Sequence, residues 1–338
     1  MTTKAPGIHY VNDSDLTWSR EKRGQGVRFL NKNGRPLKNS VERISKLAIP
    51  PAWTKVRISP NEKGHIQAIG FDERGRKQYI YHPDWVAHQQ KHKFDSMVRF
   101  GELLPELRKI TAGHMRQQHL TKQRLLATVV WLLEHTFIRV GNKTYEKENQ
   151  SYGLTTLRGK HVAVRGDKIR FSFKGKSGVY HDLDITHPRV AKTIKACIEL
   201  PGYEIFKYLD ENDQRQRIDS RDVNEYLQEI TGEALSAKDF RTWGGTTLAG
   251  DLFYRLDEPQ QDEELTREQL IKQVVEQVAD HLGNTTAVCR QYYIHPKVIT
   301  SFSQGKLWPH FQKVYARHKS PGLSLGEKAT WLLLGGKG

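Results

Sequence analysis

The spacing of apolar residues changes once along this chain of 338 residues, close to residue 90. Before that point, short runs rich in β-branched and aromatic residues alternate with glycine-containing turns, which is typical of strands joined by tight connections. These runs are 27–30, 56–59, 65–69 and 77–81. Beyond residue 90, apolar residues recur at the spacing of amphipathic helices. The sequence therefore predicts an α+β protein, with a small antiparallel β-rich domain over 1–90 and a larger, mainly helical domain over 91–300.

The strongest helical pattern covers residues 116–140. Its apolar stripe consists of Leu126, Val129, Val130, Leu133, Phe137 and Val140. Gly141 follows the stripe and is predicted to end the helix. Arg139 would then lie in the last turn, where an arginine most often only complements the helix dipole.

Near the end of the helical domain, a helix over 265–282 is predicted to stop at Gly283. A short second helix follows, capped by Thr285 or Thr286, and it carries Tyr292 and Tyr293. A tyrosine on such a short, polar-flanked helix either packs into the core or faces a large substrate. The local pattern alone leaves both interpretations open.

A β-hairpin is predicted earlier in this domain, with strands over 168–174 and 179–185 and Lys176 at the tip of the turn. The letters GKS at the turn resemble part of a phosphate-binding loop. That motif requires glycine where this chain has Arg170, and a helix where this chain has a strand. ATP binding at this turn is therefore excluded, and Lys176 is either solvated or inserted into a groove of a partner.

Three further predictions concern the second half of the chain. Ser236 can cap a helix that has Arg241 near its exposed first turns. The acidic stretch 257–268 predicts a linker. Residues 297–338 contain seven Lys or Arg against one Glu, so 301–338 is predicted to form a loosely packed basic tail.

The charge balance favours a polyanionic partner. The chain has 54 Lys plus Arg and 38 Asp plus Glu, a net charge of +16. Because each phosphate contact releases counterions, nucleic acid is the first candidate. Gln78, Tyr79 and Tyr81 lie beside the basic run 74–77, a mixture suited to base edges and phosphates of a duplex. An ordinary solvated sheet face is the alternative.

The two cysteines, Cys197 and Cys289, are too few for a disulfide framework or a four-cysteine zinc site. Nothing in the sequence resembles a signal peptide or a membrane span. A cytoplasmic, nucleoid-associated protein is therefore expected, with no membrane partner.

Four segments in order carry a family resemblance: 137–157 with FIRVGNKTY, 173–178 with FKGKSG, 238–246 with KDFRTWGGT, and 282–296 with LGNTTAVCRQYYIHP. Together they resemble the catalytic domain of the type IB DNA topoisomerases, the compact bacterial and poxvirus kind. The run KQYIYH at 77–82 is similar to the small DNA-contacting domain of that family.

The resemblance implies that Tyr293 is the nucleophile, with Arg139, Lys176 and Arg241 as catalytic partners. Arginine forks can hold the nonbridging oxygens of a phosphodiester, on which charge grows in the transition state, and a lysine can protonate the leaving 5′ oxygen. Family members usually have histidine at the position of Asn284. The asparagine amide can donate a hydrogen bond there, but it cannot transfer a proton as a histidine can. Tyr145 matches a phosphate contact of the family.

The implied activity is relaxation of supercoiled DNA by a monomer that closes as a clamp around duplex DNA and requires neither metal nor nucleotide cofactor. A tyrosine recombinase is the nearest alternative, although it normally has histidine at the position of Lys238. A basic protein that only binds DNA is the second alternative. Metal-dependent nicking is disfavoured because the sequence has no H-E-x-x-H motif.

Overall fold

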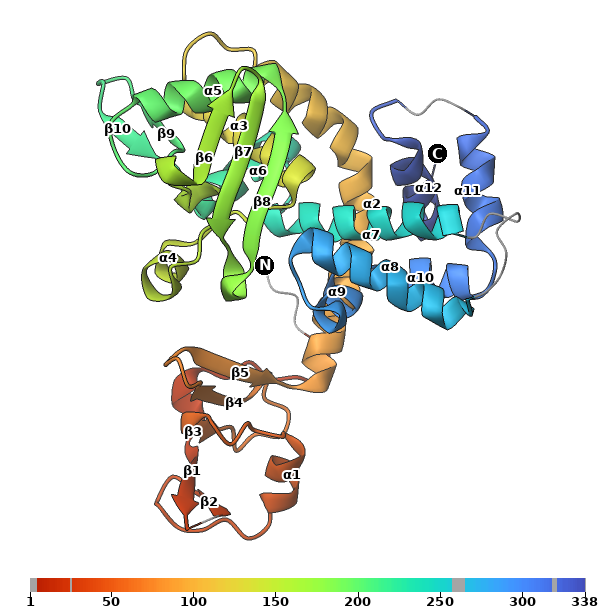
Figure 1. Ribbon diagram of the computed structural model, residues 1–338. Helices are drawn as coiled ribbons and strands as arrows, with labels where there is room; N and C mark the ends of the chain where they lie inside the picture. Colours follow the sequence, from red (N-terminus) through yellow and green to blue (C-terminus); the bar gives the residue numbers. More distant parts are fainter. Residues whose placement is uncertain (1–4, 25, 257–264, 318–320, 338) are drawn as a thin grey trace. The chain divides into compact units, whose positions relative to one another are not determined.

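The computed structural model describes residues 5–24, 26–256, 265–317 and 321–337. The chain forms two compact units, Met1–Phe94 and Asp95–Gly338, and the boundary lies within helix α2 (Pro83–His114) (Figure 1). Each unit has a hydrophobic core of its own. The combination of an antiparallel sheet and a larger helical part confirms the predicted α+β class.

The first unit contains a five-stranded sheet with the order β2-β1-β3-β4-β5. Its strands are β1 (Trp18–Arg23), β2 (Gly26–Leu30), β3 (Thr54–Ile58), β4 (Ile66–Phe71) and β5 (Lys77–Tyr81). All neighbouring strands pair antiparallel. Helix α1 (Val41–Lys46) supplies Ile44 to a core that includes Val56 and Ile58.

Strand β1 and helix α1 were not predicted. The segment 18–23 has the sequence WSREKR, so it lacks the apolar alternation of a half-buried strand. It is a strand because it pairs with both β2 and β3. Long-range backbone pairing, rather than local pattern, therefore determines this part of the sheet.

The second unit begins with the C-terminal part of α2 and with α3 (Lys122–Thr136). The predicted helix over 116–140 is too long at both ends. Thr121 caps α3 by accepting a hydrogen bond from the backbone N–H of Arg124, and Phe137, with φ of 51°, ends it in the left-handed conformation. Arg139 therefore lies beyond the helix, and the expected contact with the helix dipole is wrong.

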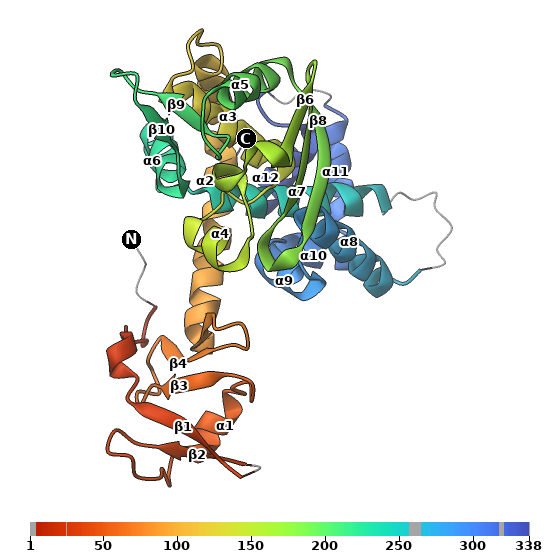
Figure 2. The ribbon, with the colours of Figure 1, turned by 60° about the vertical axis from the view of Figure 1, so that its left-hand side comes forward.

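The predicted hairpin is part of a three-stranded antiparallel sheet with the order β6-β7-β8. Its strands are β6 (Val162–Arg165), β7 (Lys168–Lys174) and β8 (Tyr180–Thr186), and helix α5 (Pro188–Glu199) packs against β6 and β7. The turn between β7 and β8 contains the 3₁₀ segment η4 (Lys176–Gly178). In Figures 1 and 2 the tip of this hairpin lies between α4 (Lys143–Asn149) and α9 (Thr286–Tyr292). A small ribbon of β9 (Lys207–Leu209) and β10 (Arg215–Arg217) precedes helix α6 (Ser220–Thr231).

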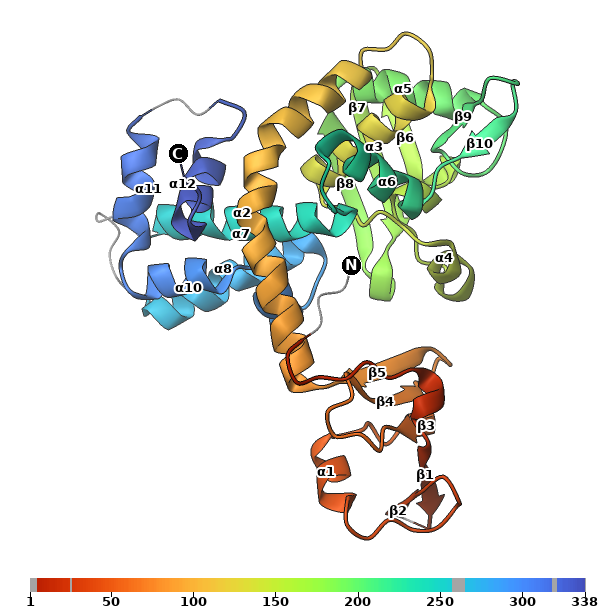
Figure 3. The same ribbon diagram turned by 180° about the vertical axis from the view of Figure 1, so that it is seen from behind.

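The centre of the second unit is helix α7 (Ala237–Leu256), which the C-terminal part of α2 crosses (Figure 3). Trp243 of α7 packs with Phe100 of α2, their ring centroids 5.7 Å apart. Helix α8 (Arg267–Leu282) packs beside α7. Of the predicted linker 257–268, residues 257–264 lie outside the described part of the chain.

The expected loosely packed tail is wrong. Within its described residues, this segment contains the end of helix α10 (Pro296–Ser303) and the helices α11 (Leu307–Tyr315) and α12 (Leu325–Leu334). Phe302, Leu307 and Phe311 are fully buried in the same core as α7 and α8. The charge count misled the prediction because lysines on the outer face of an amphipathic helix raise its net charge without weakening its apolar face.

Candidate active site

Tyr293 lies at the C-terminal end of the short helix α9, where the preceding turn places it beside α7. Helix α8 stops at Gly283, whose φ is 60°, and Thr285 caps α9 by accepting a hydrogen bond from the N–H of Val288, as predicted. Thr246 on α7 donates from Oγ1 to the carbonyl oxygen of Tyr293 at 3.0 Å. The partly buried Tyr293 is therefore fixed through its backbone.

Arg241 lies on the face of α7 that meets Tyr293. Its Cζ is 5.2 Å from the centroid of the Tyr293 ring. Its two terminal nitrogens donate to the carbonyl oxygens of Phe137 and Leu282, the second at 2.7 Å. The side chain is 3% exposed, so the expectation that it lies near an exposed turn is wrong. Packing of α7 against α3 and α8 buries the face of the helix that carries Arg241.

Arg139 approaches the same place from the segment after α3. Its Nη2 donates to the side-chain oxygen of Asn284 at 2.5 Å and lies 3.5 Å from the carbonyl oxygen of Gly283. Burial lowers the pKa of Arg139, and the neighbouring phenol of Tyr293 opposes that shift. Burial and the Arg139 cation lower the pKa of Arg241 to about 10, so the Arg241 guanidinium remains charged at neutral pH.

Three buried N–H groups at this place have no hydrogen-bond partner within the described residues: Arg139 Nη1, Arg241 Nε and Asn284 Nδ2. Buried polar groups are almost always paired, and an unpaired one destabilises the fold by about 1–3 kcal/mol. Two of these groups are cationic, and all three are donors. These three donors, which lie beside the phenol of Tyr293, are therefore suited to bind an anion with several acceptor oxygens, such as a phosphodiester.

Lys176 occupies the turn η4, as predicted. Its Nζ lies 5.7 Å from the centroid of the Tyr145 ring, so the structure brings these two predicted site residues together. Tyr145 is 48% exposed on α4. Lys176 is also exposed, and its ammonium can therefore reach a bound substrate.

The other predicted DNA contacts lie on β5 of the first unit. The rings of Tyr79 and Tyr81 stack with centroids 5.8 Å apart, and Lys77 Nζ lies 5.1 Å from the centroid of Tyr79. Gln78, whose side chain points to the other face of the strand, donates to Asp72 at 3.0 Å. Tyr79 and Tyr81 thus form an exposed aromatic pair, whereas the Gln78 amide is engaged within the protein.

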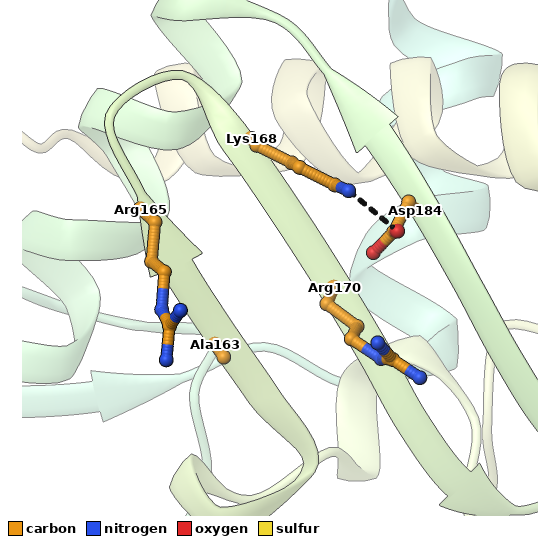
Figure 4. A pocket seen from close by; sticks show the side chains of 5 residues that line it. All are labelled: Ala163, Arg165, Lys168, Arg170 and Asp184. Carbon is orange, nitrogen blue, oxygen red and sulfur yellow. Dashed lines mark ion pairs between the residues drawn. The ribbon is translucent and has the colours of Figure 1, made fainter.

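A separate pocket of about 280 Å³ lies on the three-stranded sheet and is lined by Ala163, Arg165, Lys168, Arg170 and Asp184 (Figure 4). Lys168 pairs with Asp184 at 2.8 Å, and Arg170 with Asp182 at 2.6 Å. These pairs offset most of the positive charge of the pocket. It contains none of the predicted site residues.

Within the described residues, no three His, Cys, Asp or Glu side chains gather in a way that could hold a metal ion. None of the helices in the described ranges is both long and apolar enough to cross a bilayer. The expectation that neither metal nor nucleotide is needed stays a prediction.

Comparison with known proteins agrees with this geometry. Residues 82–309 match the family model for the catalytic core of eukaryotic DNA topoisomerase I. The chain belongs to the type IB DNA topoisomerases. Residues 26–72 match the N-terminal domain of bacterial DNA topoisomerase IB, so this type IB topoisomerase has a bacterial-type first unit.

Relatives from several sources support the same family. A DNA topoisomerase 1B of Acanthamoeba polyphaga mimivirus is 35% identical over 231 residues, which cover 67% of this topoisomerase and 69% of the relative. The DNA topoisomerase 1B of Vaccinia virus (strain Copenhagen) is 23% identical over 240 residues, 68% of this chain and 70% of the relative. The protein is therefore an isomerase that acts on DNA, and these relatives give no support to the recombinase alternative.

Proposed function

We propose that Tyr293 is the nucleophile with which this topoisomerase relaxes supercoiled duplex DNA. The phenol loses its proton to water, its oxygen attacks a backbone phosphorus, the bond from phosphorus to the 5′ oxygen breaks, and a 3′-phosphotyrosyl bond forms. The free 5′ strand rotates, and its hydroxyl then attacks phosphorus and releases Tyr293. The phosphotyrosyl linkage is again a phosphodiester and keeps the free energy of the bond that was broken, so resealing needs no ATP.

The observation that carries this proposal is the group of unpaired donors beside the Tyr293 ring. Arg139 Nη1, Arg241 Nε and Asn284 Nδ2 are buried and without partners among the described residues. Negative charge grows on the nonbridging oxygens as the phenol attacks, and preorganised donors stabilise it without reorganising. The fixed guanidinium of Arg241, with its other nitrogens bonded to two carbonyl groups, suits this role.

Lys176 supplies the proton that the leaving 5′ oxygen requires. It lies in a turn and is exposed, so it can reach the strand being cut. The same lysine accepts a proton from the 5′ hydroxyl when the strand is resealed. Asn284 holds Arg139 through its side-chain oxygen and offers its amide N–H to the phosphate, without transferring a proton.

Three exposed phenols, those of Tyr145, Tyr79 and Tyr81, contact phosphates of the duplex. Gln78 lies on β5 with Tyr79 and Tyr81, but its amide donates to Asp72, so the proposed contacts do not include it. We further propose that the enzyme acts as a monomer in the cytoplasm, at the nucleoid, because its substrate is there. It acts without a metal or nucleotide cofactor.

The test is relaxation of a supercoiled plasmid in the presence of a chelator and without ATP, beside the Tyr293→Phe variant. The wild type is expected to relax the plasmid and to leave an adduct with DNA that survives denaturation, and the variant to do neither. Relaxation by Tyr293→Phe, or a strict requirement for magnesium, would contradict the proposal. An adduct that forms only at one sequence and only with partner DNA would favour a recombinase.

A further inference from the structure

His181 lies on β8, next to the turn that carries Lys176. It is opposite Phe173 in the antiparallel register of β7 and β8. The two rings stack with centroids 4.9 Å apart and planes inclined by 17°. The imidazole is therefore held in a defined orientation by a fully buried aromatic ring of the sheet.

The same imidazole fits between two glycines. A Cβ atom on Gly175 would lie 2.6 Å from its Cδ2, and one on Gly283 would lie 3.1 Å from its Cε1. Gly175 directly precedes Lys176, and Gly283 directly precedes Asn284. The His181 ring thus packs against the backbone at Gly175, in the hairpin tip, and at Gly283, in the segment that leads into α9 and Tyr293. A Cβ atom on Gly283 would also lie 3.3 Å from Cγ1 of Val179, the residue that follows the turn.

The two arginines also influence the charge state of the imidazole. Burial, Arg139 and Arg241 lower the pKa of His181 to about 4, so the ring is neutral at neutral pH. A neutral ring can pack beside two guanidiniums without adding a third positive charge. A lysine or arginine at this position would repel both.

We propose that His181 is a positioning residue for Lys176: its ring holds the tip of the hairpin against the segment Gly283–Asn284, beside Tyr293. The proposal rests on the proposed role of Lys176 as the proton donor. Without the ring, the hairpin tip loses its packing against the nucleophile segment. The ammonium group then spends less time at the 5′ oxygen, while Arg139 and Arg241 keep their own hydrogen bonds.

The test compares cleavage of a duplex oligonucleotide with an ordinary 5′ oxygen and one with sulfur in place of that bridging oxygen. A thiol has a pKa of about 8.5, far below that of an alcohol, so a sulfur leaving group needs no proton. His181→Ala is expected to slow single-turnover formation of the adduct on the oxygen substrate by on the order of 100-fold, the effect of a misplacement of about 1 Å. On the sulfur substrate its rate is expected to approach that of the wild type.

The double variant His181→Ala with Lys176→Ala is expected to be no slower than Lys176→Ala alone, because both substitutions impair the same function, proton donation by Lys176. His181→Phe keeps a flat ring over Phe173 and is expected to recover most of the rate on the oxygen substrate. Asp184→Ala is the matched control on the same strand, since Asp184 pairs with Lys168 on the exposed face. Thermal unfolding of each variant shows that it is folded.

The proposal is overturned if His181→Ala slows adduct formation, relative to the wild type, by the same factor on the sulfur substrate as on the oxygen substrate. An additive defect in the double variant, or a His181→Phe variant as slow as His181→Ala on both substrates, also overturns it. A Lys176→Ala variant that sulfur does not rescue rejects the proton-donor role of Lys176 instead. In that case the double variant alone decides whether His181 acts through Lys176.

Discussion

The guanidinium of Arg241 lies over the aromatic ring of Tyr293, with its Cζ 5.2 Å from the ring centroid. The two residues come from different helices, and each is fixed independently: Arg241 by carbonyl oxygens, and Tyr293 by Thr246. A cation at this distance both orients the ring and stabilises negative charge near the phenol. Arg241 therefore links the orientation of the proposed nucleophile, Tyr293, to the proposed phosphate-binding group.

Replacement of Arg241 should therefore slow cleavage strongly. Arg241→Ala is expected to lower the single-turnover rate of adduct formation by at least about 100-fold, the usual effect of removing one preorganised donor. Arg241→Lys keeps the charge but loses the planar fork, so it should recover only part of the rate. Full activity of either variant in the adduct assay would contradict the proposed role.

Asn284 should matter less than Tyr293, because it donates a hydrogen bond but transfers no proton. Asn284→Ala is expected to slow cleavage modestly, whereas Tyr293→Phe abolishes it. Asn284→Asp should be slower than Asn284→Ala, because a carboxylate would pair with Arg139 and repel the phosphate. The rates of adduct formation test this order, and equal, total loss in Asn284→Ala and Tyr293→Phe would refute this division of roles.

Thr246 fixes the backbone around Tyr293: its Oγ1 donates to the carbonyl oxygen of Tyr293 and accepts from the N–H of His295, each at 3.0 Å. Thr246→Val removes both bonds with little change in shape, and should lower the free energy of unfolding by about 1–3 kcal/mol. It should also slow cleavage. Thr246→Ser retains the hydroxyl, so urea unfolding and cleavage of this variant should stay close to the wild type.

The C-terminal helices should contribute directly to stability. Phe311 is fully buried in the core that contains α7, so Phe311→Ala is expected to lower the free energy of unfolding by about 3–5 kcal/mol. Lys313→Ala, on the exposed face of the same helix, is the control and should change it little. If both variants unfold at the same denaturant concentration as the wild type, α11 does not stabilise the unit.

Stability should fall in mild acid partly because of His295. Burial, together with Lys297, lowers its pKa to about 4 in the folded protein, against an ordinary value of 6.5. Between these values the unfolded chain binds the proton more tightly, so stability is lost as pH falls from about 6.5 to about 4. His295 also caps α10, accepting from the N–H of Lys297.

His295→Asn keeps a side chain that can cap the helix but does not titrate. Denaturant unfolding at pH 7 and pH 5 should therefore show a smaller loss of stability for this variant than for the wild type. An equal loss in both proteins would mean that other groups cause the acid sensitivity.

The sequence by itself determined the features that depend on neighbours along the chain. The glycine stop at Gly283, the cap at Thr285 and the turn around Lys176 follow from local backbone preferences, and the structure contains all of them. The family motifs also predicted a shared site for Arg139, Arg241 and Tyr293, and the structure brings these residues together. Their resemblance to the type IB topoisomerases is confirmed by the family models.

The tertiary structure decided everything that depends on burial and on contacts between distant segments. Arg241 is buried because helices from other parts of the chain cover α7, and Phe311 is core although its segment is basic. His181 lies between Gly175 and Gly283, an arrangement that no periodicity predicts. Local pattern specifies how the backbone turns, whereas the environment of a side chain is set by which segments pack around it. That packing places the unpaired donors of Arg139, Arg241 and Asn284 together beside a phenol.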